Sequence, residues 1–132
     1  MKFHHFGLAV FKFEPAVGFF KSLGYHCSQP LIDPLQNVEL VLCTSDIQPW
    51  VELIRPVNEK SPVQNFLKKN QEMIYHCCYS VKLIDNKTVK NYFPGMKTLN
   101  ISPPKPAILF ENCRVAFYYV KGLGLIELLE KP

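Results

Sequence analysis

The stretch Met73–Val81 (MIYHCCYSV) decides the fold, because it repeats the beginning of the chain, Phe3–Val10 (FHHFGLAV). In each stretch a histidine, His76 or His5, stands five residues before the valine that closes a run typical of a β-strand. A helical pattern and further strand-like runs follow each stretch. The repeat therefore indicates that the chain is built from two copies of one structural unit.

The ends of the two halves also match. Trp50–Ile54 (WVELI) resembles Leu125–Leu129 (LIELL), and each run holds one carboxylate, Glu52 or Glu127, among apolar residues. Each half thus has a histidine near its start and a glutamate near its end, at similar separations. A doubled unit that keeps one His and one Glu per copy suggests a single site made from both copies.

The bulk properties indicate one compact domain, because 132 residues with 48% apolar content can form a sizeable core. The formal net charge is +4, but the lysines are scattered and form no basic stripe. This distribution argues against a nucleic-acid surface and is compatible with an anionic small substrate.

The five cysteines are odd in number and fit no zinc-finger spacing. We expect all five to be buried free thiols in a reducing compartment. The N-terminus shows no signal-peptide pattern, and no apolar run approaches the roughly 20 residues that span a bilayer. We therefore expect a cytoplasmic protein.

Hydrophobic periodicity predicts strand, helix, strand, strand, strand in each half, an α+β fold. The first half has expected strands at 2–10, 25–29, 38–43 and 50–55, a helix that begins at Glu14-Pro15 and ends at Gly24, and a loop at 31–35. The second half has expected strands at 73–81, 98–101, 114–120 and 124–130, a weak helix at 85–92 and a proline-rich loop at 102–106. Between the halves, Ser61-Pro62 is typical of a helix start, and the helix is expected to end near Asn70.

Four residues are candidates for chemistry: His5, Glu52, His76 and Glu127. A carboxylate inside an apolar strand is costly unless it is paired or bound to a metal. Taken singly, each glutamate could lie on the solvent face of an edge strand, and each histidine could be hydrogen-bonded in the core. All four at repeat-related positions favour a site for one borderline divalent ion.

Several motifs carry a resemblance to a known family. They are His5–Val10, Phe19–Tyr25, Val51–Pro56, Ser61–Val63, Ile74–His76 and Gly124–Leu128. In these motifs the chain resembles the vicinal oxygen chelate superfamily (the glyoxalase, bleomycin-resistance and dioxygenase group), most closely its methylmalonyl-CoA epimerases.

The resemblance implies two paired βαβββ modules that form a curved mixed sheet around a metal site. It implies one domain over 1–132, with module 1 at about 1–57, a connecting helix at about 61–70 and module 2 at about 73–132. It also implies one divalent ion (Zn, Ni, Co or Mn) held by His5, Glu52, His76 and Glu127, a homodimer, and a CoA or glutathione thioester or adduct as substrate.

One position departs from the epimerase pattern. These epimerases carry an acid in a Pro-Glu-Gln-Gly-Val motif, whereas here the run is Pro34–Val38 (PLQNV), which places Leu35 at that position. Epimerisation normally needs two acid–base groups on opposite faces of the substrate carbon. Glu127 is the expected main proton carrier and Glu52 a second one, with Asp33 on the same loop as a less favoured replacement for the missing acid.

Three alternatives to an epimerase remain open. A glyoxalase I-like enzyme, in which ligand carboxylates move the proton themselves, fits the loss of the acid. A non-catalytic binding or resistance module is the second, although such modules commonly lack the metal ligands. A dioxygenase is disfavoured, because that chemistry usually needs three protein ligands and open positions on iron.

Overall fold

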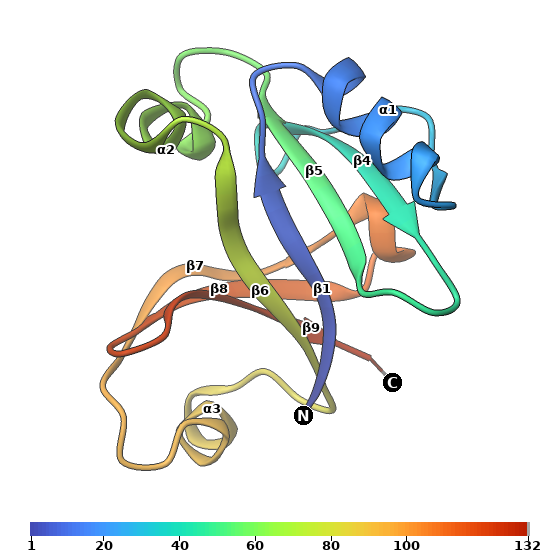
Figure 1. Cartoon of the computed structure of the whole chain (residues 1–132). Helices are drawn as coiled ribbons and strands as arrows, with labels where there is room; N and C mark the ends of the chain where they lie inside the picture. The colour runs from blue at the N-terminus through green and yellow to red at the C-terminus, as the bar shows by residue number, and fades with distance from the viewer. Residues whose placement is uncertain (132) are drawn as a thin grey trace. The chain divides into compact units, whose positions relative to one another are not determined.

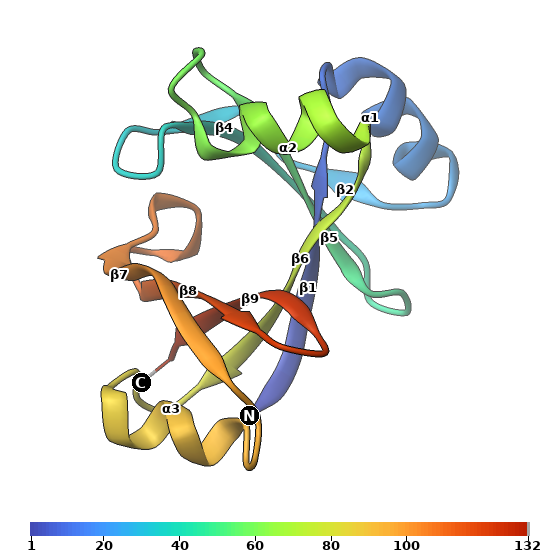
Figure 2. The same cartoon turned by 90° about the vertical axis from the view of Figure 1, so that its left-hand side faces the viewer.

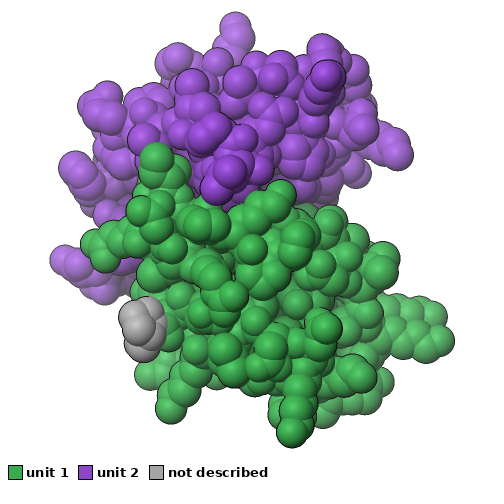
Figure 3. Space-filling view, turned by 180° about the vertical axis from the view of Figure 1, so that it is seen from behind, with its two compact units in different colours: residues 1–4, 76–132 green, residues 5–75 purple. Residues whose placement is uncertain are grey.

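The computed structural model describes residues 1–131. The internal contacts of the chain divide it into two compact units, coloured separately in Figure 3. Unit 2 comprises His5–Tyr75, and unit 1 comprises Met1–His4 together with His76–Pro132. That the two modules make one domain stays a prediction.

Unit 2 contains a mixed sheet in the order β2-β4-β5-β1 (Figure 1). Its elements are β1 (Lys2–Ala9), α1 (Phe13–Ser22), β2 (His26–Cys27), β3 (Leu31–Asp33), β4 (Val38–Thr44), β5 (Trp50–Pro56) and α2 (Pro62–Asn70). β1 pairs with β5 in parallel, and β4 pairs with β5 antiparallel. The predicted strands and both helices are found, with ends shifted by a few residues.

The expectation of a loop at 31–35 is wrong, because Leu31–Asp33 forms the strand β3. β3 pairs with one end of β4, and β2 pairs with the other end. Together β2 and β3 act as one edge strand that is interrupted around Pro30. The two prolines flank the three paired residues, so no ladder hydrogen bond of β3 is lost to them.

Unit 1 repeats the arrangement with the strand order β6-β9-β8-β7. Its elements are β6 (Met73–Val81, of which residues 73–75 belong to unit 2), α3 (Asn86–Tyr92), β7 (Thr98–Pro106), the 3₁₀ turn η1 (Ile108–Phe110), β8 (Arg114–Val120) and β9 (Gly124–Glu130). β6 pairs with β9 in parallel, while β7 and β8 pair antiparallel with their neighbours. The predicted α+β fold of two βαβββ modules is thereby confirmed.

The proline-rich segment 102–106 was also expected to be a loop, and this expectation is wrong. β7 runs through it as far as Pro106 and pairs antiparallel with β8. The register shifts between Asn100 and Ser102 and again between Ser102 and Lys105. Among the described strands of unit 1, β7 pairs with β8 alone, and an edge strand can lack N–H donors on its open side.

One face of each sheet is covered by a helix. In unit 2, Phe13 of α1 belongs to the same buried cluster as Val51 and Leu53 of β5, and Figure 1 shows the helix beside β4 and β5. In unit 1, Val89 of α3 belongs to the same buried cluster as Ile126 of β9, and Figure 2 shows the helix next to the strands of unit 1. Because side chains alternate along a strand, the residues between these positions point to the other face.

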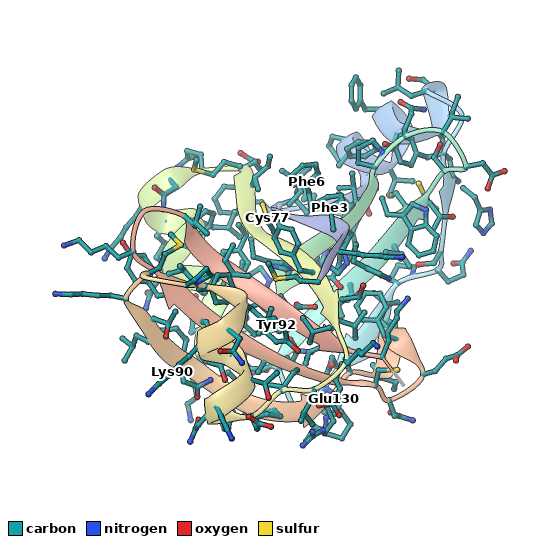
Figure 4. All side chains as sticks on the ribbon, turned by 90° about the horizontal axis from the view of Figure 1, so that it is seen from below. Phe3, Phe6, Cys77, Lys90, Tyr92 and Glu130 are labelled. Atoms are coloured by element: carbon teal, nitrogen blue, oxygen red, sulfur yellow. The ribbon has the colours of Figure 1, made fainter. Side chains whose placement is uncertain are left out.

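The first residues of β1 belong to unit 1. The ring of Phe3, labelled in Figure 4, meets Tyr79 of β6 edge to face at a centroid distance of 5.9 Å. The Ser80 hydroxyl donates to the carbonyl of Lys2 over 3.4 Å.

Unit 1 is further tied by Glu130 at the end of β9, also labelled in Figure 4. Its carboxylate accepts hydrogen bonds from the guanidinium of Arg114 and, over 2.7 Å, from the backbone N–H of Ile84. These bonds fasten the segment that follows β6 to the last strand.

The five cysteines are free thiols. Cys43 and Cys78 are buried as expected, but Cys27, Cys77 and Cys113 are partly exposed, which corrects the expectation that all five are buried. Within residues 1–131, every helix is too short or too polar to cross a membrane.

Candidate metal site

In unit 2, His5 and Glu52 lie on the sheet face opposite α1. Gly7 of β1 is aligned with Glu52 of β5, and His5 stands two residues before Gly7 on the same face of β1. Nε2 of His5 lies 3.8 Å from Oε2 of Glu52.

In unit 1, His76 and Glu127 form the equivalent pair. Cys78 of β6 is aligned with Glu127 of β9, and His76 stands two residues before Cys78. Nε2 of His76 lies 3.3 Å from Oε2 of Glu127. The diagonal is the same as in unit 2, so the repeat seen in the sequence extends to the strand register.

All four side chains are buried, with 0% exposure for His5, 4% for Glu52, 2% for His76 and 2% for Glu127. Burial therefore excludes the interpretation of either glutamate as a residue on a solvent face. Burial also lowers the pKa of His76 to about 3, because it disfavours the charged imidazolium. His76 is accordingly neutral at pH 7, the form in which histidine binds metals.

The wall of the unit 1 pair is partly aromatic. Phe117 of β8 is aligned with Glu127, and its ring meets the His76 ring edge to face at a centroid distance of 5.2 Å. Phe117 therefore helps to keep water from the pair. The contact of Phe117 with His76 depends on the pairing of β8 with β9, which the local sequence pattern does not reveal.

Each pair has the chemistry and spacing of ligands that share one ion. Each offers an imidazole nitrogen and a carboxylate oxygen. Bonds of about 2.0–2.2 Å at angles near 90–110° place two ligand atoms roughly 3.0–3.5 Å apart. The 3.3 Å separation in unit 1 lies in this range, and the 3.8 Å separation in unit 2 is slightly longer.

The position that carries the acid in the epimerase motif is exposed. Leu35 lies in the turn between β3 and β4 with 55% of its surface exposed. Asp33 is buried and accepts hydrogen bonds from the backbone N–H groups of Leu35 and Gln36 and from the Gln36 amide. The turn engages both carboxylate oxygens of Asp33, which disfavours this residue as the missing acid.

Two cationic side chains, Arg55 and Lys68, pair with carboxylates of the protein. Arg55 lies 3.0 Å from a carboxylate oxygen of Glu39 and stacks over the ring of Phe13. Lys68 lies 3.0 Å from Glu59 on an exposed surface. These contacts engage both cations with the protein's own carboxylates.

Comparison with known proteins gives the same picture. The family model of the Glyoxalase/Bleomycin resistance protein/Dioxygenase superfamily matches residues 4–117. The mitochondrial methylmalonyl-CoA epimerase of Dictyostelium discoideum is 30% identical over 134 residues, covering 98% of this chain and 78% of that protein. An ethylmalonyl-CoA/methylmalonyl-CoA epimerase of Cereibacter sphaeroides is 29% identical over 106 residues, covering 79% and 78%.

Solved structures share the fold. Methylmalonyl-CoA epimerase from Mycobacterium tuberculosis superposes with a TM-score of 0.80 at 22% identity, covering 99% of this chain and 88% of that one. A Streptomyces coelicolor methylmalonyl-CoA epimerase variant in complex with 2-nitronate-propionyl-CoA gives a TM-score of 0.77 at 23% identity, covering 99% and 97%. The repeated modules, the two His–Glu pairs and these matches together show that the chain belongs to the glyoxalase, bleomycin-resistance and dioxygenase superfamily, with methylmalonyl-CoA epimerases among its relatives.

Proposed function

We propose that the protein is a metal-dependent isomerase that moves a proton at the carbon next to the thioester carbonyl of an acyl-CoA. The observation that carries the proposal is the pair of buried His–Glu diagonals at the same register in both units. The relatives that act on methylmalonyl-CoA, as their names state, support the substrate class.

In this proposal His5, Glu52, His76 and Glu127 together hold one divalent ion. Two imidazoles and two carboxylates suit zinc, nickel, cobalt or manganese. A bound ion of this kind acts as a Lewis acid on a carbonyl oxygen and makes the neighbouring C–H bond more acidic.

Glu127 is proposed as the main proton carrier. It is a buried carboxylate beside the neutral imidazole of His76, and Phe117 excludes water from the same wall. Glu52 is proposed as a ligand that can serve as a second carrier.

Leu35 sets this chain apart from a two-base epimerase. With Leu35 exposed and Asp33 engaged by its turn, the described residues of this turn offer no acid comparable to the one in the epimerase motif. This favours proton transfer by the ligand carboxylates alone, which is the mode of a lactoylglutathione lyase (glyoxalase I). That activity is therefore the second candidate, and a non-catalytic binding module is the third.

The partners proposed are a CoA or glutathione thioester and a second copy of the chain. The Streptomyces relative binds a propionyl-CoA analogue, and a net charge of +4 favours the approach of an anionic substrate. A cytoplasmic location is proposed on the sequence alone.

The test is deuterium incorporation in D₂O. Protein loaded with each of the four metals is incubated with methylmalonyl-CoA or with the hemithioacetal of methylglyoxal and glutathione. We expect metal-dependent deuterium uptake at C2 of the CoA ester that falls by at least about 100-fold in Glu127→Gln. Turnover of the glutathione adduct alone would select the glyoxalase I alternative. If neither compound is turned over with any metal, the non-catalytic binding module is the remaining candidate function.

A further inference from the structure

Two cysteines of unit 2 face each other across neighbouring strands. Cys27 of β2 is aligned with Cys43 of β4 in the antiparallel register, and their Sγ atoms lie 2.9 Å apart. Neither residue belongs to the candidate metal site. The segment between the two cysteines contains β3 and the turn that follows it.

The backbone at this position suits a disulfide. Residues directly opposite each other in an antiparallel pair have Cα atoms about 4.5–5.5 Å apart, and disulfides span Cα distances of about 4.4–6.8 Å. An S–S bond of about 2.05 Å therefore requires the sulfurs to approach by less than 1 Å. β2 is two residues long and, among the described strands, pairs with β4 alone, so it can make this adjustment at small cost.

The two thiols differ in access. Cys27 is partly exposed, whereas Cys43 has 0% exposure. Burial, followed by the hydrogen bond with Cys27, raises the pKa of Cys43. A small oxidant in solution therefore reaches Cys27 first, while Cys43 is held in contact with the sulfur that has reacted.

We propose that Cys27 and Cys43 form an oxidation site at which a hydroperoxide converts the two thiols into a disulfide. The Cys27 sulfur attacks one peroxide oxygen, the O–O bond breaks, and with hydrogen peroxide one water leaves, which gives the sulfenic acid of Cys27. The Cys43 sulfur then attacks the Cys27 sulfur, the S–O bond breaks, and a second water leaves with the thiol proton. Two thiols lose two electrons, and one peroxide becomes two waters.

The disulfide would close the loop from residue 27 to residue 43. That loop contains β3 and the turn that carries Leu35. β2 is then tied covalently to β4, and the unfolded chain loses conformational freedom. Oxidation is therefore expected to raise the melting temperature by about 5–10 °C, and a reductant reverses the rise.

The experiment exposes the purified folded protein to hydrogen peroxide, alkylates the remaining thiols and maps the peptides by mass spectrometry. The expected product is a peptide pair linked through Cys27 and Cys43, about 2 Da lighter than the two thiols. Cys27→Ser and Cys43→Ser should abolish both this product and the rise in melting temperature. Cys113→Ser, a matched change of a partly exposed cysteine in unit 1, should leave both intact.

A second readout keeps the inference falsifiable if a variant is unstable. In Cys43→Ser no partner thiol can capture the sulfenic acid, so Cys27 should proceed to the irreversible sulfinic acid, which the wild type avoids. Absence of the linked pair in the wild type, or the same Cys27 products in the wild type and in Cys43→Ser, would overturn the proposal.

Discussion

Replacing Leu35 by glutamate should convert one-sided proton exchange into epimerisation. In the proposed mechanism of the wild type, ligand carboxylates remove and return a proton at the substrate carbon, but the position that carries a second acid in the epimerase motif holds an apolar side chain. Leu35→Glu supplies that acid. General acid–base groups contribute about 10²–10⁴-fold, so inversion should accelerate by this factor, which corresponds to about 2.7–5.4 kcal/mol of barrier.

The structure indicates that the substitution is tolerated. Leu35 is 55% exposed, so less than half of its apolar surface is lost from a contact. Full burial of a leucine side chain is worth about 1.5–3 kcal/mol, and the cost here should therefore stay near or below about 1 kcal/mol. The hydrogen bond from Leu35 to Asp33 uses the backbone N–H and is unaffected by the side chain.

The assay incubates each C2 epimer of methylmalonyl-CoA with metal-loaded enzyme in D₂O and compares the rate of inversion with the rate of deuterium uptake. Leu35→Gln is the matched control, because it has the same size as glutamate but carries no acid. The ratio of inversion to exchange should rise in Leu35→Glu alone. The reasoning is refuted if the wild type inverts as fast as it exchanges, or if Leu35→Glu inverts no faster than Leu35→Gln.

Three further predictions concern stability. Glu130→Gln should lower the melting temperature by about 2–6 °C at pH 7. The hydrogen bond from Arg114 outweighs the opposing effect of desolvation and lowers the pKa of Glu130. The contribution of this carboxylate to stability is therefore present above its ordinary pKa of 4.5 and is lost as the pH falls below it, so wild type and variant should converge in acid melting curves. Leu67→Ala on α2, at a fully buried position, should cost about 2–5 kcal/mol in urea unfolding, and a cost under 1 kcal/mol would contradict the packing of α2. Tyr25→Phe should cost about 1 kcal/mol, since the Tyr25 hydroxyl donates to the Pro49 carbonyl over 2.6 Å, and an unchanged urea midpoint would show that this bond contributes nothing.

The sequence alone was sufficient to predict the strands whose apolar and polar residues alternate. β6, β8 and β9 have the predicted bounds, because alternating apolar residues end at clear turns. Glu52 and Glu127 could be selected because each is a carboxylate inside an apolar run, and burial bears out that reasoning. Their role as metal ligands stays a prediction.

The features that depend on pairing with a distant segment could not be predicted. The prolines of β7 led to the prediction of a loop. The segment can form a strand because only the edge that pairs with β8 requires backbone N–H donors. β3 is too short to show an alternation of apolar and polar residues. It forms because its backbone can pair with β4. The contact of Cys27 with Cys43 likewise depends on the register of β2 against β4.

The number of divalent ions bound per chain tests the central claim most directly. Elemental analysis and titration would give this number for the wild type and for two matched variants, Glu52→Gln in unit 2 and Glu127→Gln in unit 1. A shared site predicts one ion per chain in the wild type and a loss of affinity of roughly 10²–10³-fold in both variants, since one of four ligands is weakened in each. No ion, two ions per chain, or a loss in only one of the variants would contradict a single site made from both units.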